Sequence, residues 1–146
     1  YFALLGCHPA ARYDYAGKGF TQAIAMPLYR AYDSLGLCQF ALLMGQPPFL
    51  EWLNAATGWA MEETEFFECG KRIQILRHAF NAKQGLPAQF VLPARERGEP
   101  PQTLGPVANH TLDMDAMAKT YFEFLGIDPQ TGFPLSETIR DLHLDM

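Results

Sequence analysis

Apolar residues recur at intervals of three and four along much of this chain, which is the periodicity of an amphipathic α-helix. The clearest case lies between Glu62 and Asn81, where a single apolar stripe is predicted, made of Phe66, Cys69, Ile73, Leu76 and Phe80. Acidic residues crowd the start of this segment and basic residues its end, the order that the helix dipole favours. Gly85 is expected to stop the helix. We expect the stripe to be part of the core, not a functional site.

A second helix is expected from Gly19 to about Leu35, although Pro27 must start or kink a helical turn within it. Gly36 follows at a position where helix ends commonly adopt a left-handed conformation. Leu37 and Cys38 should therefore leave the helix axis in a tight turn.

The remaining helices are expected to be shorter, and they are predicted at Phe49–Ala56, from a cap at Asp113 to Gly126, and at Ser136–Leu142. Residues 86–110 contain five prolines, so we expect a long crossing on the surface without regular structure. No alternating apolar pattern exceeds a few residues. The sequence therefore predicts an all-α, irregular multi-helical domain with a long Pro-rich crossing, and residues 1–146 as one domain.

Composition narrows the class of protein. A formal net charge of −5 gives no electrostatic reason to expect nucleic acid or an anionic membrane as partner. Cys7, Cys38 and Cys69 are odd in number and widely spaced, which argues against a disulfide framework and for a reducing, cytoplasmic setting. The chain begins at Tyr1 without an initiator Met or a signal-like stretch, and we interpret it as a fragment of a longer chain.

One short segment carries candidate chemistry, Asp33-Ser34-Leu35-Gly36-Leu37-Cys38. It places a hydrogen-bond acceptor and a soft metal ligand in a single turn. The alternative is a capped helix end followed by a buried cysteine, and the pattern alone favours this alternative. The common signatures of nucleotide, zinc and nucleophile sites do not occur in the sequence.

Four segments together resemble the C-terminal region of the tungsten-containing aldehyde ferredoxin oxidoreductases in order and spacing; they are Tyr32–Phe40, Leu53–Trp59, Gly70–Ile73 and Phe80–Gly85. Further downstream, similar segments are Gly105–Pro106, Leu112–Asp113, Tyr121–Phe122 and Gly126–Pro134. The resemblance covers about residues 17–146.

The resemblance implies specific roles. In that family an Asp-x-x-Gly-Leu-Cys segment contacts one of two pterins, and its Cys gives one thiolate to a four-iron cluster. Asp33 would then accept hydrogen bonds from a pterin, Gly36 and Leu37 would allow close backbone approach, and Cys38 would ligate iron. The other three cluster cysteines, the second pterin segment and the pterin-covering domain have no counterpart in this sequence. We therefore expect this chain by itself to bind no metal and to be inactive.

The function implied by the resemblance is oxidation of aldehydes, or related oxo or acyl substrates, by a tungsten or molybdenum bis-pterin. Electrons would pass through a 4Fe-4S cluster to ferredoxin. The implied partners are ferredoxin, the remainder of the chain and a small aldehyde, and a homo-oligomer is left open. The alternative is a non-catalytic helical module of the same fold, used in partner binding or subunit assembly, since a fold does not specify function.

Other residues receive weaker assignments. His8 is a candidate for proton transfer near the metal, and the alternative is a histidine that only hydrogen-bonds within a loop. We expect Cys7 and Cys69 to be structural. His78 and His110 are predicted at the surface, and Trp52 and Trp59 as core and capping aromatics.

Overall fold

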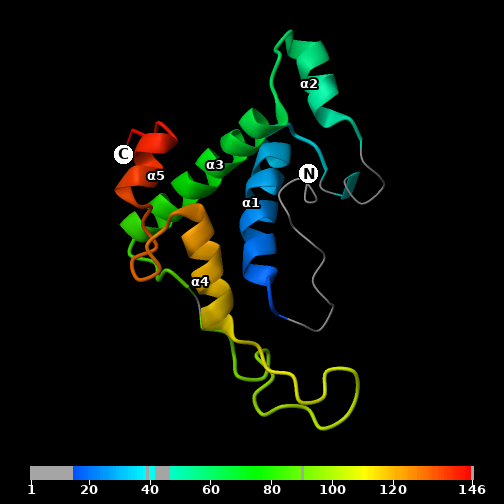
Figure 1. Ribbon diagram of the computed structural model, residues 1–146, viewed down its shortest axis with the longest axis vertical. Coiled ribbons are helices and arrows are strands. Elements are labelled where there is room, and N and C mark those ends of the chain that lie inside the picture. Colours follow the sequence, from blue (N-terminus) through cyan, green and yellow to red (C-terminus); the bar gives the residue numbers. More distant parts are fainter. Residues whose placement is uncertain (1–14, 39, 42–46, 90, 146) are drawn as a thin grey trace.

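The computed structural model describes residues 15–38, 40–41, 47–89 and 91–145. These residues contain five α-helices and no β-sheet, which confirms the all-α fold (Figure 1). The helices are α1 (Lys18–Ser34), α2 (Phe49–Thr57), α3 (Glu63–Lys83), α4 (Met114–Leu125) and α5 (Ser136–Asp141). Helix α1 packs against both α3 and α4, and α2 extends beyond the start of α3 (Figure 1).

Helix α1 lies very close to its two neighbours. Gly70 of α3 faces the carbonyl oxygen of Pro27, and Gly19 of α1 faces the carbonyl oxygen of Met117 on α4. A β-carbon at either glycine would collide with that backbone atom. Pro27 lies inside α1 and is fully buried. Backbone-to-backbone packing at these two glycines therefore determines how close α1 lies to α3 and α4.

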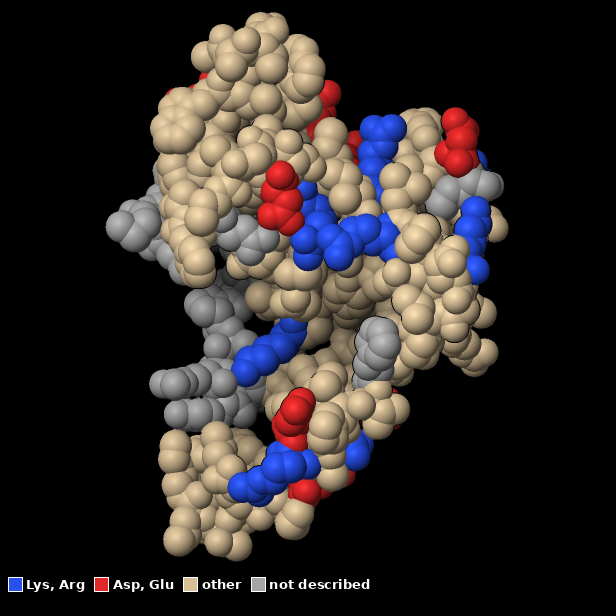
Figure 2. All heavy atoms as spheres, turned by 180° about the vertical axis from the view of Figure 1, so that it is seen from behind, with Lys and Arg blue, Asp and Glu red and all other residues tan. Residues whose placement is uncertain are grey.

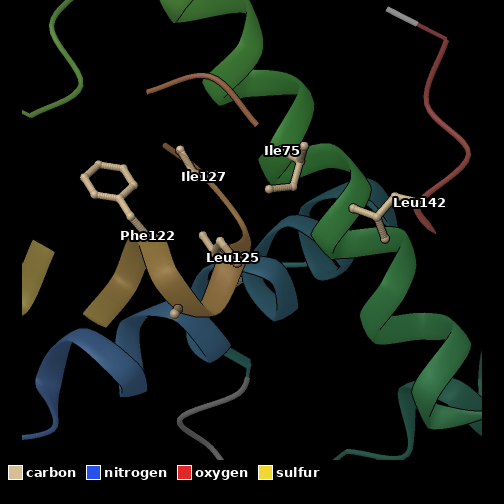
Figure 3. Packing of buried hydrophobic residues seen from close by; sticks show 6 residues of the cluster. Ile75, Phe122, Leu125, Ile127 and Leu142 are labelled. Carbon is tan, nitrogen blue, oxygen red and sulfur yellow. The ribbon is translucent and has the colours of Figure 1, made fainter. Parts of the chain in front are cut away.

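The main core is formed where α3, α4 and the segment after α5 meet. Figure 3 shows Ile75 of α3 and Leu125 of α4 converging there with Phe122, Ile127 and Leu142. Ile75 and Leu125 are both 0% exposed. Burial of each such large apolar side chain contributes roughly 1.5 to 3 kcal/mol before the loss of conformational entropy is counted. This core joins the C-terminal segments to α3.

The predicted apolar stripe of α3 is only partly in the core. Phe66 is buried, but Leu76 is 44% exposed and Phe80 is 63% exposed. The residues of α3 that are buried are Phe66, Gly70, Gln74, Ile75 and Ala79. The prediction that the whole stripe is core was therefore wrong. The physical reason is tertiary packing, because α1 lies against Gly70 while Ile75 packs with residues of α4, and neither contact lies on the predicted stripe.

The helix ends agree with the sequence predictions better than the apolar stripe does. Gly36, Gly58 and Gly126 have φ values of 70°, 74° and 70° and follow α1, α2 and α4. The side chain of Asp113 caps α4 by accepting a hydrogen bond of 2.9 Å from the backbone N–H of Ala116. The predicted left-handed conformation at Gly36, the helix end at Gly126 and the cap at Asp113 are confirmed.

The Pro-rich crossing between α3 and α4 contains no helix among its described residues, and most of their side chains are exposed. Trp52 and Trp59 are 54% and 58% exposed, which contradicts the core part of their prediction as core and capping aromatics. In the described part of the chain, no helix has both the length and the apolar character needed to cross a membrane.

Candidate functional site

The Asp33–Cys38 segment forms the turn that ends α1. The backbone N–H groups of Leu35 and Gly36 donate to the carbonyl oxygens of Tyr32 and Asp33, at 3.0 and 3.1 Å. The positive φ of Gly36 then reverses the chain, and Leu37 and Cys38 lie beyond the helix end. The carbonyl of Cys38 accepts a hydrogen bond of 2.9 Å from the N–H of Ala41. The turn therefore holds Asp33 and Cys38 at the same end of one helix.

Tyr32 fixes this helix end to the rest of the fold. Its ring makes edge-to-face contacts with Phe49 of α2 and Phe66 of α3, with ring centroids 4.8 and 5.4 Å apart. Such aromatic pairs contribute about 0.5 to 1.5 kcal/mol beyond the area they bury. Burial raises the pKa of Tyr32, and the nearby Glu63 carboxylate raises this pKa further. The turn is thus attached to two other helices immediately before the candidate site.

Asp33 has a charged neighbour on its own helix. Nη1 of Arg30 donates to Oδ2 of Asp33 at 2.7 Å, and the two side chains are 21% and 39% exposed. A pair with this exposure stabilises the fold by no more than about 1 kcal/mol. The Arg30 carbonyl also accepts a hydrogen bond from Oγ of Ser34 at 2.8 Å. Arg30 therefore orients the Asp33 carboxylate without withdrawing it from solvent.

Cys38 is exposed and its thiol is free. The alternative prediction was a capped helix end followed by a buried cysteine. The helix end is present, but the cysteine is exposed, so the second part of that alternative was wrong. Nothing lies within 4 Å of the space that a β-carbon on Gly36 would occupy, so the backbone of the turn is open on that side. An exposed thiol is the type of ligand that iron–sulfur clusters use, and an exposed carboxylate can accept hydrogen bonds from a ligand.

The described residues do not contain a complete metal site. Within the described residues, no group of three or more His, Cys, Asp or Glu side chains is placed to hold a metal ion. Cys69 is a free, half-buried thiol on α3. Cys7 and His8, the second a candidate for proton transfer, lie outside the described residues. The described turn thus offers one thiolate ligand, whereas a 4Fe-4S cluster needs four ligands.

A second polar cluster was not predicted from the sequence. It joins α3 to α4 through Gln74, His78 and Tyr121. Nε2 of Gln74 donates to Oη of Tyr121 at 2.8 Å, and Nε2 of His78 lies 2.9 Å from the same oxygen. His78 is half-buried, so its prediction as a surface residue was wrong, whereas His110 is exposed as predicted.

Burial sets the protonation states of this cluster. It lowers the pKa of His78, and the charge of Arg77 lowers it further. Burial also raises the pKa of Tyr121, against an opposing effect of the hydrogen bond from Gln74. Burial therefore favours the neutral form of both rings, which is compatible with a Tyr121 hydroxyl that donates to an unprotonated His78 nitrogen. The only sequence signal was a pair of polar residues four apart on α3, because Tyr121 lies 43 residues beyond His78.

The fold and the turn define a class of protein, namely a helical domain that presents a free thiol and a carboxylate from one helix end. The family model described as "Aldehyde ferredoxin oxidoreductase, domains 2 & 3" matches residues 6–144. The chain therefore belongs to the aldehyde ferredoxin oxidoreductase family, which confirms the resemblance found in the sequence.

Individual relatives carry the same family name. The chain is 33% identical over 96 residues to a tungsten-containing aldehyde ferredoxin oxidoreductase of Pyrococcus furiosus, a match that covers 64% of this chain and 16% of the relative. It is 30% identical over 116 residues to the protein of that name in Pyrococcus horikoshii, covering 77% and 19%. The chain thus spans less than a fifth of the length of these relatives. No solved structure matches it significantly.

Proposed function

We propose that this chain forms one side of a metallopterin and iron–sulfur site in an enzyme that oxidises aldehydes or related oxo or acyl substrates. The observation that carries the proposal is the exposure of Cys38 at the end of α1, where Asp33 is also exposed. Membership in the family, whose relatives are named as tungsten-containing oxidoreductases, supports this assignment.

Each residue of the turn has a separate task in this proposal. Cys38 would ligate one iron of a 4Fe-4S cluster, because thiolates are the ligands that such clusters use. Asp33 would accept hydrogen bonds from pterin N–H groups while Arg30 keeps its carboxylate oriented. Gly36 and Leu37 would let the pterin approach the backbone, since a side chain at position 36 would fill the open space there.

The cofactors would supply the redox chemistry: a tungsten or molybdenum bis-pterin would accept electrons from the substrate, and the cluster would pass them to ferredoxin. The chain's own contribution would be to hold one side of these groups in place. His8 would transfer a proton near the metal. The remainder of the enzyme would have to supply the other cluster thiolates, because the described residues offer only the exposed Cys38 at the turn.

The test of the proposal is a substitution at Asp33 in the complete enzyme that carries this segment. Asp33→Ala should lower both the pterin content and the aldehyde-dependent reduction of a dye, while thermal stability changes little because the Arg30–Asp33 pair is weak. Asp115→Ala is the matched control, since Asp115 is an exposed aspartate in the first turn of α4. Full pterin content and activity in Asp33→Ala would refute the role of Asp33.

The non-catalytic alternative gives a different result. A module used only for assembly would have no need of the remaining cofactor ligands, so the coding sequence upstream of this segment distinguishes the two functions. The proposal requires a Cys-x-x-Cys-x-x-x-Cys segment and a second Asp-x-x-Gly-Leu segment there. A complete protein that lacks both would be a helical module and not this enzyme.

A further inference from the structure

Helix α2 is largely apolar and yet mostly exposed. Phe49 is its buried residue, and Glu51 is the one charged residue of Phe49–Thr57. Trp52 is 54% exposed, and Trp59, which follows the helix, is 58% exposed. Helix α2 packs extensively against none of the other described helices. Grouped exposed apolar surface of this kind marks interaction sites more often than scattered apolar residues do.

This exposed helix is nevertheless held in a fixed position. The ring of Phe49 contacts the rings of Tyr32 in α1 and of Trp52, with centroids 4.8 and 5.7 Å apart. The side chain of Asn54 donates to the carbonyl oxygen of Met61 at 2.9 Å and accepts from the N–H of Met61 at 3.0 Å. Because these contacts already restrict α2, a partner that binds it would cause little further loss of conformational freedom.

The same part of the chain is strictly acidic. Between Arg30 and Lys71 the sequence contains no Lys, Arg or His. The acidic residues in this interval are Asp33, Glu51, Glu62, Glu63, Glu65 and Glu68. We call the surface formed by α2, residues 58–62 and the first turns of α3 up to Glu68 the α2 end. The topmost lobe in Figure 2 is the α2 end seen from behind, and it shows acidic side chains and no Lys or Arg.

The α2 end lies beside the turn that carries Cys38. Tyr32 directly precedes Asp33 in α1, and its ring contacts both Phe49 of α2 and Phe66 of α3. Under the proposed function, Cys38 supplies one ligand of a four-iron cluster, and a polypeptide segment outside this sequence supplies the other thiolates. The ligands of one cluster lie close together, so that segment has to reach the immediate neighbourhood of Cys38. The α2 end is the exposed surface next to it.

We propose that the α2 end binds a basic face of the polypeptide that supplies the other cluster ligands, namely the remainder of the complete enzyme. This inference rests on the proposed function, because the shared cluster is what requires that polypeptide to lie beside Cys38. Trp52 and Trp59 would form the apolar centre of the contact, and Glu51 and Glu68 would pair with Lys or Arg at its rim. The chain spans less than a fifth of the length of its relatives, so a complete protein of that length has ample polypeptide to cover this surface.

Charge argues against a second copy of the same surface as the occupant. Two α2 ends brought together would place glutamates against glutamates, and like charges across an interface weaken binding. A basic occupant instead offsets the repulsion among the glutamates at the start of α3. Since Glu51 and Glu68 are exposed, their attraction to a basic face is screened by salt.

Hydroxyl-radical footprinting of the complete enzyme, read by mass spectrometry, tests whether the α2 end is covered. After correction for intrinsic reactivity, Trp52 and Trp59 should be protected at least about fivefold more than Leu104, because the centre of an interface excludes solvent. Leu104 is the reference because it is 81% exposed and lies outside the α2 end. Tryptophans as accessible as Leu104 would overturn the proposal.

Charge reversal tests the basic character of the occupant. The double substitution Glu51→Lys and Glu68→Lys should lower the protection of both tryptophans by at least about threefold, because like charges would then meet across the contact. The matched control is Glu96→Lys with Glu137→Lys, which makes the same change in net charge at exposed positions outside the α2 end. Circular dichroism checks that both variants fold. Protection that survives the reversal at the α2 end would overturn the proposal.

Two further outcomes identify the occupant and separate this inference from the proposed function. Protection that disappears when a co-purifying protein is removed would assign the surface to a separate partner and would overturn the proposal. Exposed tryptophans in an enzyme whose bound iron depends on Cys38 would refute the inference alone. Protected tryptophans together with unchanged iron in Cys38→Ser would refute the cluster assignment, and with it the reason given for the contact.

Discussion

Gly70 of α3 lies directly against the carbonyl oxygen of Pro27 in α1, and no side chain can be accommodated between them. Ala31, one turn further along α1, borders the same contact. The closest approach of the two helices is therefore a backbone contact, and large side chains such as Tyr32 of α1 and Phe66 of α3 pack beside it. Because Asp33 and Cys38 follow on the same helix, this contact also determines where the candidate cofactor site lies relative to α3.

The Gly70 contact predicts a reversal of the usual helix propensity. Gly→Ala in a helix interior normally stabilises by about 1 kcal/mol. Gly70→Ala should instead destabilise the chain by about 1 to 3 kcal/mol, because the methyl group forces α1 and α3 apart. Urea denaturation followed by circular dichroism measures this difference. An unchanged or increased free energy of unfolding would contradict the contact.

Gly36 offers a prediction about the turn itself. Its φ of 70° lies in the left-handed region, where a residue with a β-carbon is strained by about 1 to 2 kcal/mol. Gly36→Ala should lower the free energy of unfolding by about 1 kcal/mol, and Gly36→Asn by less, because asparagine tolerates this conformation better. In the complete enzyme, Gly36→Val should lower pterin content beyond what its stability explains, since its side chain enters the open space beside the turn.

Stability should depend on pH because of the polar cluster formed by Gln74, His78 and Tyr121. The pKa of His78 is lowered from its ordinary value of 6.5, so the unfolded chain binds a proton at a higher pH than the folded chain does. The stability gained from neutral His78 is therefore present above about pH 6.5 and is lost as the pH falls through the lowered pKa. Urea denaturation between pH 8 and pH 5 should show this loss.

Substitutions at two histidines, one in the cluster and one exposed, test whether His78 causes this pH dependence. His78→Asn should flatten the dependence of the unfolding free energy between pH 7 and pH 5.5, whereas His110→Asn, at an exposed position, should leave it unchanged. The Tyr121→Phe variant should reduce stability at pH 7 by about 1 kcal/mol through loss of the hydrogen bonds at its hydroxyl. Equal pH profiles for His78→Asn and the unmodified chain would show that another group is responsible.

Sequence patterns were most informative where local chemistry decides the structure. Glycines at 36, 85 and 126 were predicted to stop helices, and each follows a helix with a φ of 70 to 73°. The cap at Asp113 was predicted for a similar reason, because its side chain needs only the first turn of the helix that follows it. These features involve neighbours within a few residues, so the sequence alone contains the necessary information.

Patterns failed where distant segments decide the structure. The apolar stripe of α3 has helical spacing, but α1 lies against Gly70 and α4 contacts Gln74 through Tyr121, while Leu76 and Phe80 stay exposed. Periodicity predicts that a helix has an apolar face. It does not predict which face of the helix packs most closely against a neighbouring helix. The exposure of Cys38 was likewise not predictable from the pattern, which favoured a buried thiol.

The iron content of the complete enzyme, with Cys38 changed, tests the assignment of the site most directly. Cys38→Ser should remove or destabilise the cluster and lower both bound iron and aldehyde-dependent dye reduction. Cys69→Ser is the matched control, because Cys69 is a free thiol on α3 outside the turn. We predict loss of iron in Cys38→Ser and retention in Cys69→Ser; unchanged iron in Cys38→Ser would contradict the assignment.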